Sequence, residues 1–194
     1  MPNWCYTSYA VSGDKNEVDD LYAKMMSLEN RKESLVQNGF GKTWLGNLVT
    51  LLGGDWETVY CRGEWYNLQH SGNHIFFTTM SAWGDPDETM RFLQTKYPTL
   101  VYYFQAEETG MAYYATNDVE GIHFPERYYF DGPDYSEPAC YAENELEDFL
   151  HDVGNFLGRE IRSVEEAQRA INEYNAQQEN VDDFAKIKIY QVIS

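Results

Sequence analysis

The first thirty residues change their hydrophobic period once, and this change limits the possible folds more than any other feature of the chain. Residues 3–11 alternate between two faces and are rich in aromatic and β-branched side chains, which predicts a strand that ends at Gly13. From residue 14 to residue 31 the apolar side chains recur at helical spacing. Asp14 and Glu17 form the sequence signature of a capping box at the start of this helix.

The middle of the chain predicts a short helix and then a hairpin. Thr43 is placed as the N-cap of a helix over residues 44–52, which two glycines close. Residues 62–69 and 74–82 are β-prone runs on either side of a turn cluster, and together they predict a hairpin.

A second helix and a second hairpin follow. We expect Asp85 to be the N-cap of this helix, Pro86 its first residue and Glu88 its third, with Pro98 ending it. Residues 99–106 then read as a strand, which a Thr-Gly turn connects to a returning strand over residues 111–116.

The C-terminal third contains two helices between strands. A strand is predicted over residues 127–130, and a Gly/Pro-rich loop follows it. Helices are expected over residues 143–153 and, from a capping box at Ser163, to about residue 178. The alternating run over residues 184–193 predicts one last strand.

This order of elements predicts an α+β protein. Strand, helix, insert, two strands, helix and strand is the split βαβ order of ferredoxin-like folds, in which helices cover one face of an antiparallel sheet. We expect a ferredoxin-like domain over residues 1–130, which carries an extra hairpin. Residues 131–194 are expected to form an acidic helical extension whose final strand packs on the same domain.

Two separated motifs resemble a known family. The opening MPNWC and the later stretch FFTTMSAWGDP…KYPTLVYYFQAEETG are similar to the Api-like family of ferredoxin-like-domain proteins from phages, plasmids and other mobile elements. The resemblance covers roughly residues 1–130, and it implies the ferredoxin-like fold and a mobile-element origin. It implies no reaction, and the spacing of the cysteines does not fit an iron–sulfur cluster.

The charge of the chain argues against polyanionic ligands. The formal net charge is −18, and residues 107–194 hold 20 acidic and 6 basic side chains, a net −14. Such a field repels nucleic-acid backbones and anionic membranes. Three widely spaced cysteines, together with the absence of a signal-peptide or membrane-spanning pattern, predict a cytoplasmic protein with reduced thiols.

No motif for catalysis, a metal or a cofactor is evident. The stretch GFGKTWLG contains Gly-Lys-Thr, but Val36 stands where a phosphate-binding loop needs its first glycine. A zinc site from Cys61, His70 and His74 is conceivable, and the expectation is that no metal is bound. Glu107 and Glu108 could form a carboxylate pair, although a solvated turn is the simpler interpretation. We therefore expect a non-enzymatic protein without a cofactor.

The function expected from these patterns is binding to a partner protein with a basic surface, such as a nucleic-acid-binding protein of a host. The alternative is binding of a small ligand or single-stranded nucleic acid on an aromatic sheet face. The alternative would use Tyr102, Tyr103, Tyr113 and Tyr114. The oligomeric state and the identity of the partner stay open. Candidate contact residues for the acidic partner-binding surface are Trp83, Glu107, Glu108, Glu143, Glu147, Asp148 and Asp152.

Overall fold

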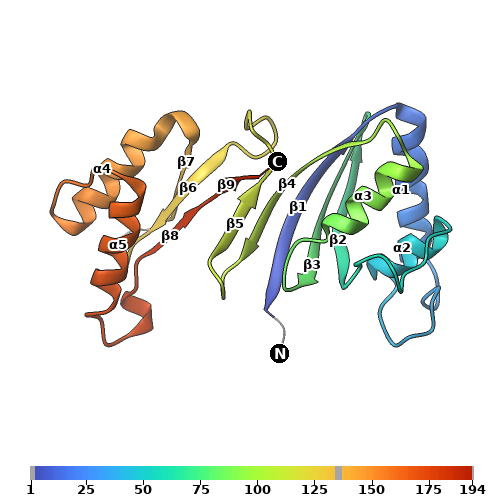
Figure 1. The fold of residues 1–194 in the computed structure, drawn as a ribbon, viewed down its shortest axis with the longest axis horizontal. Helices are drawn as coiled ribbons and strands as arrows, with labels where there is room; N and C mark the ends of the chain where they lie inside the picture. The colour runs from blue at the N-terminus through green and yellow to red at the C-terminus, as the bar shows by residue number, and fades with distance from the viewer. Residues whose placement is uncertain (1–2, 134–136, 194) are drawn as a thin grey trace. The chain divides into compact units, whose positions relative to one another are not determined.

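A computed structural model describes residues 3–133 and 137–193 of the chain, and it shows an α+β protein (Figure 1). The described residues form five α-helices, together with strands in two compact units. Unit 1 is Met1–Tyr113 and unit 2 is Tyr114–Ser194, whereas the sequence patterns place a boundary near residue 130. No helix of the described residues has the length and apolar character needed to cross a bilayer.

Unit 1 contains four strands of an antiparallel sheet in the order β2-β3-β1-β4. The expected hairpin is therefore present as β2 and β3, and β1 lies between the hairpin and β4. The elements of this unit are β1 (Trp4–Ser12), α1 (Lys15–Glu29), α2 (Leu45–Leu51), β2 (Gly63–Ser71), β3 (His74–Ala82), α3 (Asp87–Lys96) and β4 (Val101–Glu108).

The three helices of unit 1 lie on one face of this sheet (Figure 1). On β1 the residues with odd numbers from Cys5 to Val11 are buried, as the alternation predicts. They pack with the apolar stripe of α1, of which Val18, Leu21 and Met25 are fully buried. The opposite face keeps partly exposed rings, among them Tyr6 at 48%.

The start of α1 differs from a simple capping box. Asp14 is the N-cap, and its carboxylate accepts a hydrogen bond from the N–H of Asn16. Glu17 does not return to the backbone of Asp14 but accepts from the N–H and hydroxyl of Thr99, at 3.1 and 2.7 Å. The hydroxyl of Thr99 in turn accepts from the N–H of Asp14. A long-range contact has thus replaced the local one.

Two other helix starts are corrected by one residue. The N-cap of α2 is Trp44 rather than Thr43. The N-cap of α3 is Pro86, so the helix begins at Asp87 and not at the proline. Asp85 does not cap α3, because its carboxylate accepts the hydroxyl of Tyr113 at 2.9 Å.

Unit 2 combines a three-stranded antiparallel sheet, in the order β7-β6-β8, with a parallel pair formed by β5 and β9. Phe130, Phe149, Val153 and Ile171 are buried at its centre. The elements are β5 (Tyr113–Thr116), β6 (Glu126–Asp131), β7 (Ala139–Ala142), the 3₁₀ turn η1 (Glu143–Glu145), α4 (Leu146–Leu157), α5 (Val164–Asn175), the 3₁₀ turn η2 (Val181–Asp183), β8 (Lys186–Ile189) and β9 (Gln191–Val192).

The sequence patterns missed two features of unit 2. Strand β7 lies where only a loop and a helix start were expected. The single final strand is divided at Tyr190, whose N–H donates to the carbonyl of Arg127 at 2.9 Å. As a result β8 pairs with β6, and β9 pairs with β5.

Candidate functional site

A hollow of about 920 Å³ opens on unit 1, and five aromatic side chains line it: Trp4, Phe40, Trp44, Trp56 and Tyr60. We call this hollow the aromatic groove. Its walls come from the first residue of β1, the ends of β2 and β3, and two loops. The remaining lining residues are Gly41, Glu57, Thr58, Val59, Cys61, Arg62, Gly63, Glu64, Met80, Ala82 and Glu88.

Three of the rings form a continuous wall. Phe40 stacks on Trp44, with ring centroids 5.0 Å apart and planes at 23°. Trp44 meets Trp56 edge to face at 5.3 Å and 69°. Trp44 is buried, whereas Phe40 is 57% exposed, so a ligand can reach the phenyl ring. Gly46 makes this wall possible, since a Cβ there would lie 2.3 Å from the indole of Trp44.

Asn47, a fully buried residue of α2, holds the loop that carries Phe40. Its side-chain oxygen accepts from the N–H of Val36 at 2.9 Å. Its side-chain nitrogen donates to the carbonyls of Gly41 and Lys42, at 2.9 and 3.1 Å. The amide therefore satisfies backbone groups of a segment that lacks regular structure, and this fixes one wall of the groove.

The segment of the lining around Tyr60 is attached to α3 and to the end of β3. The N–H of Tyr60 donates to Glu88 at 2.8 Å, and its carbonyl accepts the hydroxyl of Thr89 at 2.7 Å. The Tyr60 hydroxyl donates to the carbonyl of Ala82. The neighbouring thiol of Cys61 is buried, and this burial raises its pKa to about 11. Cys61 is therefore a buried thiol that stays protonated at neutral pH and packs in this part of the groove.

The charges that line the groove are three carboxylates and one guanidinium: Glu57, Glu64, Glu88 and Arg62. Glu88 is engaged by the backbone of Tyr60. In the described part of the chain, the side chains of Glu57, Glu64 and Arg62 have no ion pair within 4.0 Å and no hydrogen bond. Their charges are thus available to a ligand.

The candidate contact residues of unit 1 lie beside the start of β1. The N–H of Trp83 donates to the carbonyl of Asn3 at 2.8 Å, and its indole is 54% exposed. Glu107 is half-buried and lies opposite Tyr6 in the β1–β4 register. Glu108 is only 2% exposed, which corrects the solvated turn expected for the pair.

The carboxylate of Glu108 is bound by the chain itself. It accepts from the N–H groups of Gly110 and Met111, both at 2.8 Å. Because those bonds use the buried carboxylate to close the turn after β4, Glu108 is a structural residue.

The four tyrosines proposed for an aromatic sheet face differ in their surroundings. The hydroxyl of Tyr102 donates to Asp87 and that of Tyr113 to Asp85, both at 2.9 Å. Tyr103 is half-buried, and Tyr114 packs edge to face on Tyr190 at 5.8 Å. The sequence patterns missed the rings that are exposed on the open face of unit 1, which include Tyr6 and Tyr66, exposed by 48% and 36%.

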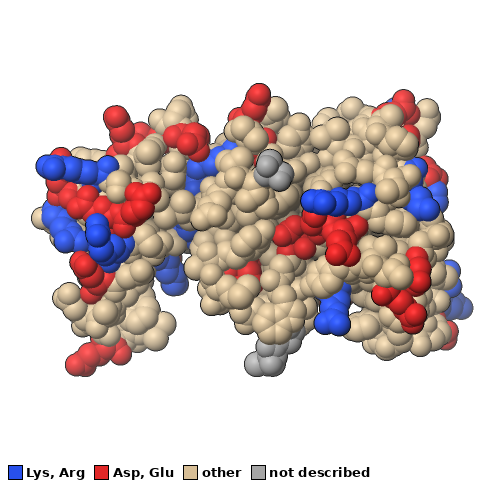
Figure 2. Space-filling model, viewed as in Figure 1, with Lys and Arg blue, Asp and Glu red and all other residues tan. Residues whose placement is uncertain are grey.

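The four acidic candidates of unit 2 do not form one row of charges. The helix expected over residues 143–153 begins only at Leu146, and Glu143 belongs to the 3₁₀ turn η1 before it. Asp152 accepts a hydrogen bond from the hydroxyl of Tyr141 at 2.5 Å, whereas Asp148 is exposed. Figure 2 shows basic side chains among the acidic ones over α4 and α5 on the face in view.

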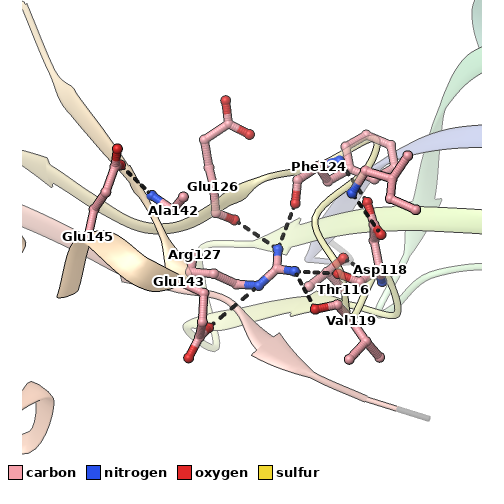
Figure 3. A network of polar contacts seen from close by, with 10 residues as sticks. Thr116, Asp118, Val119, Phe124, Glu126, Arg127, Ala142, Glu143 and Glu145 are labelled. Carbon is pink, nitrogen blue, oxygen red and sulfur yellow. Dashed lines mark hydrogen bonds and ion pairs between the residues drawn. The ribbon is translucent and has the colours of Figure 1, made fainter.

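Glu143 instead approaches a buried arginine (Figure 3). Its carboxylate lies 3.7 Å from Nε of Arg127, a side chain that is 2% exposed. The guanidinium donates to the backbone carbonyls of Phe124, at 2.6 Å, and of Asp118. The carboxylate of Asp118 accepts from the N–H groups of Ile122, His123 and Phe124. The network holds the loop between β5 and β6.

The described residues contain no group of three or more histidine, cysteine and acidic side chains able to hold a metal ion. The three residues considered for zinc have separate surroundings. His70 lies 3.1 Å from Asp19, and His74 stacks near Phe76. Cys61 donates a weak hydrogen bond to the carbonyl of Trp56 at 3.5 Å.

Comparisons with protein-family models, with curated proteins and with solved structures gave no match to this chain. The groove itself was not predicted, because its residues are spread from position 4 to position 88 and meet only in the fold. One sequence signal could have pointed to it. Residues 40–60 contain Phe40, Trp44, Trp56 and Tyr60, and all four aromatic residues lie outside α2, in the loops on either side of it.

Proposed function

We propose that this protein is a non-enzymatic interaction module that binds a partner protein with a basic surface, and that the aromatic groove of unit 1 is a contact site. One observation carries the proposal: an aromatic wall, open to solvent at Phe40, stands beside Glu57 and Glu64, whose carboxylates form no ion pair with any cation of the described residues. The net charge of −18 adds long-range attraction for a basic partner.

We further propose that unit 1 has the ferredoxin-like fold. The order β2-β3-β1-β4 with antiparallel neighbours, and the connections through α1 and α3, support this assignment. Membership of the Api-like family, a mobile-element origin and a cytoplasmic location remain predictions from the sequence. The buried thiols of Cys5 and Cys61 are compatible with a reducing compartment.

A second function is supported by the size of the groove. About 920 Å³ is within the range of pockets that take small molecules, roughly 300–1,000 Å³. Binding of a small ligand is therefore the alternative. Single-stranded nucleic acid is disfavoured, since aromatic platforms that stack bases lie in basic grooves, whereas this groove has three carboxylates against one arginine.

The proposal is tested by measuring the binding of two probes, an arginine-rich peptide and an oligothymidylate, at low and at physiological ionic strength. We expect the peptide to bind and its affinity to fall as salt rises, because exposed charges are screened over roughly 8–10 Å. We expect no retention of the oligonucleotide. Peptide binding that salt leaves unchanged, or tight oligonucleotide binding, would contradict the proposal.

A further inference from the structure

The two groups best placed to receive a ligand lie beside each other in the groove. The carboxylate oxygen Oε2 of Glu64 is 3.7 Å from the point that a Cβ on Gly41 would occupy. Gly41 follows Phe40 directly, and Phe40 presents its ring to solvent. A planar aromatic surface and an unpaired carboxylate thus come from neighbouring parts of the same wall.

The surroundings of the Glu64 carboxylate strengthen its attraction for a cation. Glu64 is half-buried and belongs to β2, which pairs with β3, and an isolated bridge joins it to Trp44. A partly desolvated carboxylate that forms no ion pair attracts a cation more strongly than a fully hydrated carboxylate does. The aromatic face adds a cation–π contribution of about 0.5–2 kcal/mol, according to its exposure.

We infer that the aromatic groove receives an arginine side chain of the partner, with its guanidinium stacked on Phe40 and bonded to the carboxylate of Glu64. This inference rests on the proposed function and names the group that the site recognises. Arginine fits better than lysine because its guanidinium is planar, stacks on rings and can bond a carboxylate through two N–H groups. Lysine is a compact and strongly hydrated charge.

One side chain of the groove opposes the binding of a cationic ligand. Arg62 lines the same hollow and is exposed. Its positive charge repels an incoming guanidinium, while Glu64 attracts it. Removing the charge of Arg62 should therefore raise the affinity for a guanidinium, and removing the charge of Glu64 should lower it. An anionic ligand would give the reverse order for the two variants.

The test uses N-acetylarginine methylamide as the probe and N-acetylcitrulline methylamide as its neutral isostere. The readout is the set of indole N–H signals in nitrogen-15 NMR, with Trp44 and Trp56 as reporters of the groove and the buried Trp65, whose indole N–H donates to Glu29 at 2.9 Å, as the reference. We expect the arginine probe to shift the groove signals with about tenfold higher affinity than the citrulline probe. Glu64→Gln should remove most of this preference, and Arg62→Gln should strengthen binding severalfold.

Equal affinity for the two probes, no effect of Glu64→Gln, or weaker binding by Arg62→Gln would overturn the inference. Unchanged melting temperatures of both variants show that the groove is still folded. The arginine-rich peptide separates this result from that of the proposed function. If the peptide binds but the signals of Trp44 and Trp56 do not move, the arginine site is wrong and the interaction function stands. If neither probe binds, both are wrong.

Discussion

The side-chain nitrogen of Asn47 donates to the carbonyl of Gly41, six residues earlier in the chain, at 2.9 Å. This bond and its companions at Lys42 and Val36 attach the loop that carries Phe40 to a buried position of α2. The loop over residues 34–42 has no regular structure, so its order depends on the side-chain amide of Asn47. Asn47 thereby connects the core of unit 1 with the aromatic groove.

Replacing Asn47 by alanine should therefore weaken both the fold and the groove. Backbone groups of the loop lose their partners, which costs about 1–3 kcal/mol for each group that stays buried. We expect a lower midpoint in urea and faster amide hydrogen exchange over residues 34–42. Asn155→Ala, at an exposed position of α4, is the control and should leave both measurements unchanged. Slow exchange in the loop of Asn47→Ala would show that other contacts hold it.

We expect every substitution of Arg127, including lysine, to lower the stability of unit 2. Its guanidinium satisfies carbonyls of Phe124 and Asp118 at the same time, and an ammonium group cannot reproduce that planar arrangement. Arg127→Lys and Arg127→Met should each lower the stability of unit 2 by about 2–4 kcal/mol. Chemical denaturation monitored in unit 2 measures this loss. Arg169→Lys, on the exposed side of α5, provides the matched control.

The neighbouring carboxylate predicts an acid-sensitive loop. Burial disfavours the charged form of Asp118, but hydrogen bonds from the N–H groups of Phe124, His123 and Ile122 outweigh it and lower the pKa below its usual value. A lowered folded pKa contributes stability that is present above the unfolded pKa, about 3.9, and is lost as the pH falls through the lower folded value.

We therefore expect the free energy of unfolding to fall between about pH 5 and pH 2, and to fall less steeply in Asp118→Asn. Urea unfolding at a series of pH values measures the two slopes. Asp148→Asn, at an exposed site of α4, should retain the steep dependence of the natural chain. Equal slopes for all three proteins would mean that Asp118 is not the group that titrates.

The sequence predicted those elements whose signals are local. The alternation before Gly13 and the apolar stripe of α1 determine a strand and a helix without help from the rest of the chain. The errors arise where a side chain forms a hydrogen bond with a distant residue instead of with the local backbone. Glu17 bonds Thr99 instead of completing its capping box, and Asp85 bonds Tyr113 instead of capping α3.

The candidate site was harder to predict for the same physical reason. Glu108 looked like a solvated turn residue because a single sequence does not show that its carboxylate closes the turn from inside. Asn47 gave no signal, since a buried asparagine bound to loop carbonyls and an exposed one have the same letter. The division of the last strand at Tyr190 depends on pairing with β6 and β5, whose partner residues are 55 or more positions away in the chain.

The cysteines should differ widely in reactivity. Burial raises the pKa of the Cys5 and Cys61 thiols to about 11, so at pH 8 on the order of one molecule in a thousand carries either thiolate. Cys140 is exposed on β7. An alkylating reagent followed by mass spectrometry should label Cys140 first and the other two only after unfolding. Rapid labelling of Cys61 would show that the wall of the groove opens, and Cys140→Ser isolates that signal.

At position 83 we expect the glycine variant to be more stable than the alanine variant, because of the backbone conformation of Trp83. Its φ angle is 72°, in the left-handed region that side chains with a Cβ adopt at a cost of roughly 1–2 kcal/mol. Trp83→Gly should therefore be more stable than Trp83→Ala by about 1 kcal/mol, the reverse of the usual order. Trp4 is the matched control, since it is 43% exposed and lies in the regular strand β1. There alanine should be more stable than glycine.

The same variants test whether the strained Trp83 contacts a partner. Backbone strain of this kind gathers at sites that bind ligands, and Trp83 is a predicted partner contact with an exposed indole. If it is a contact, Trp83→Gly should bind the arginine-rich peptide more weakly while its stability is at least that of Trp83→Ala. Unchanged peptide affinity in Trp83→Gly would remove Trp83 from the contact surface. It would leave the aromatic groove as the site to be tested.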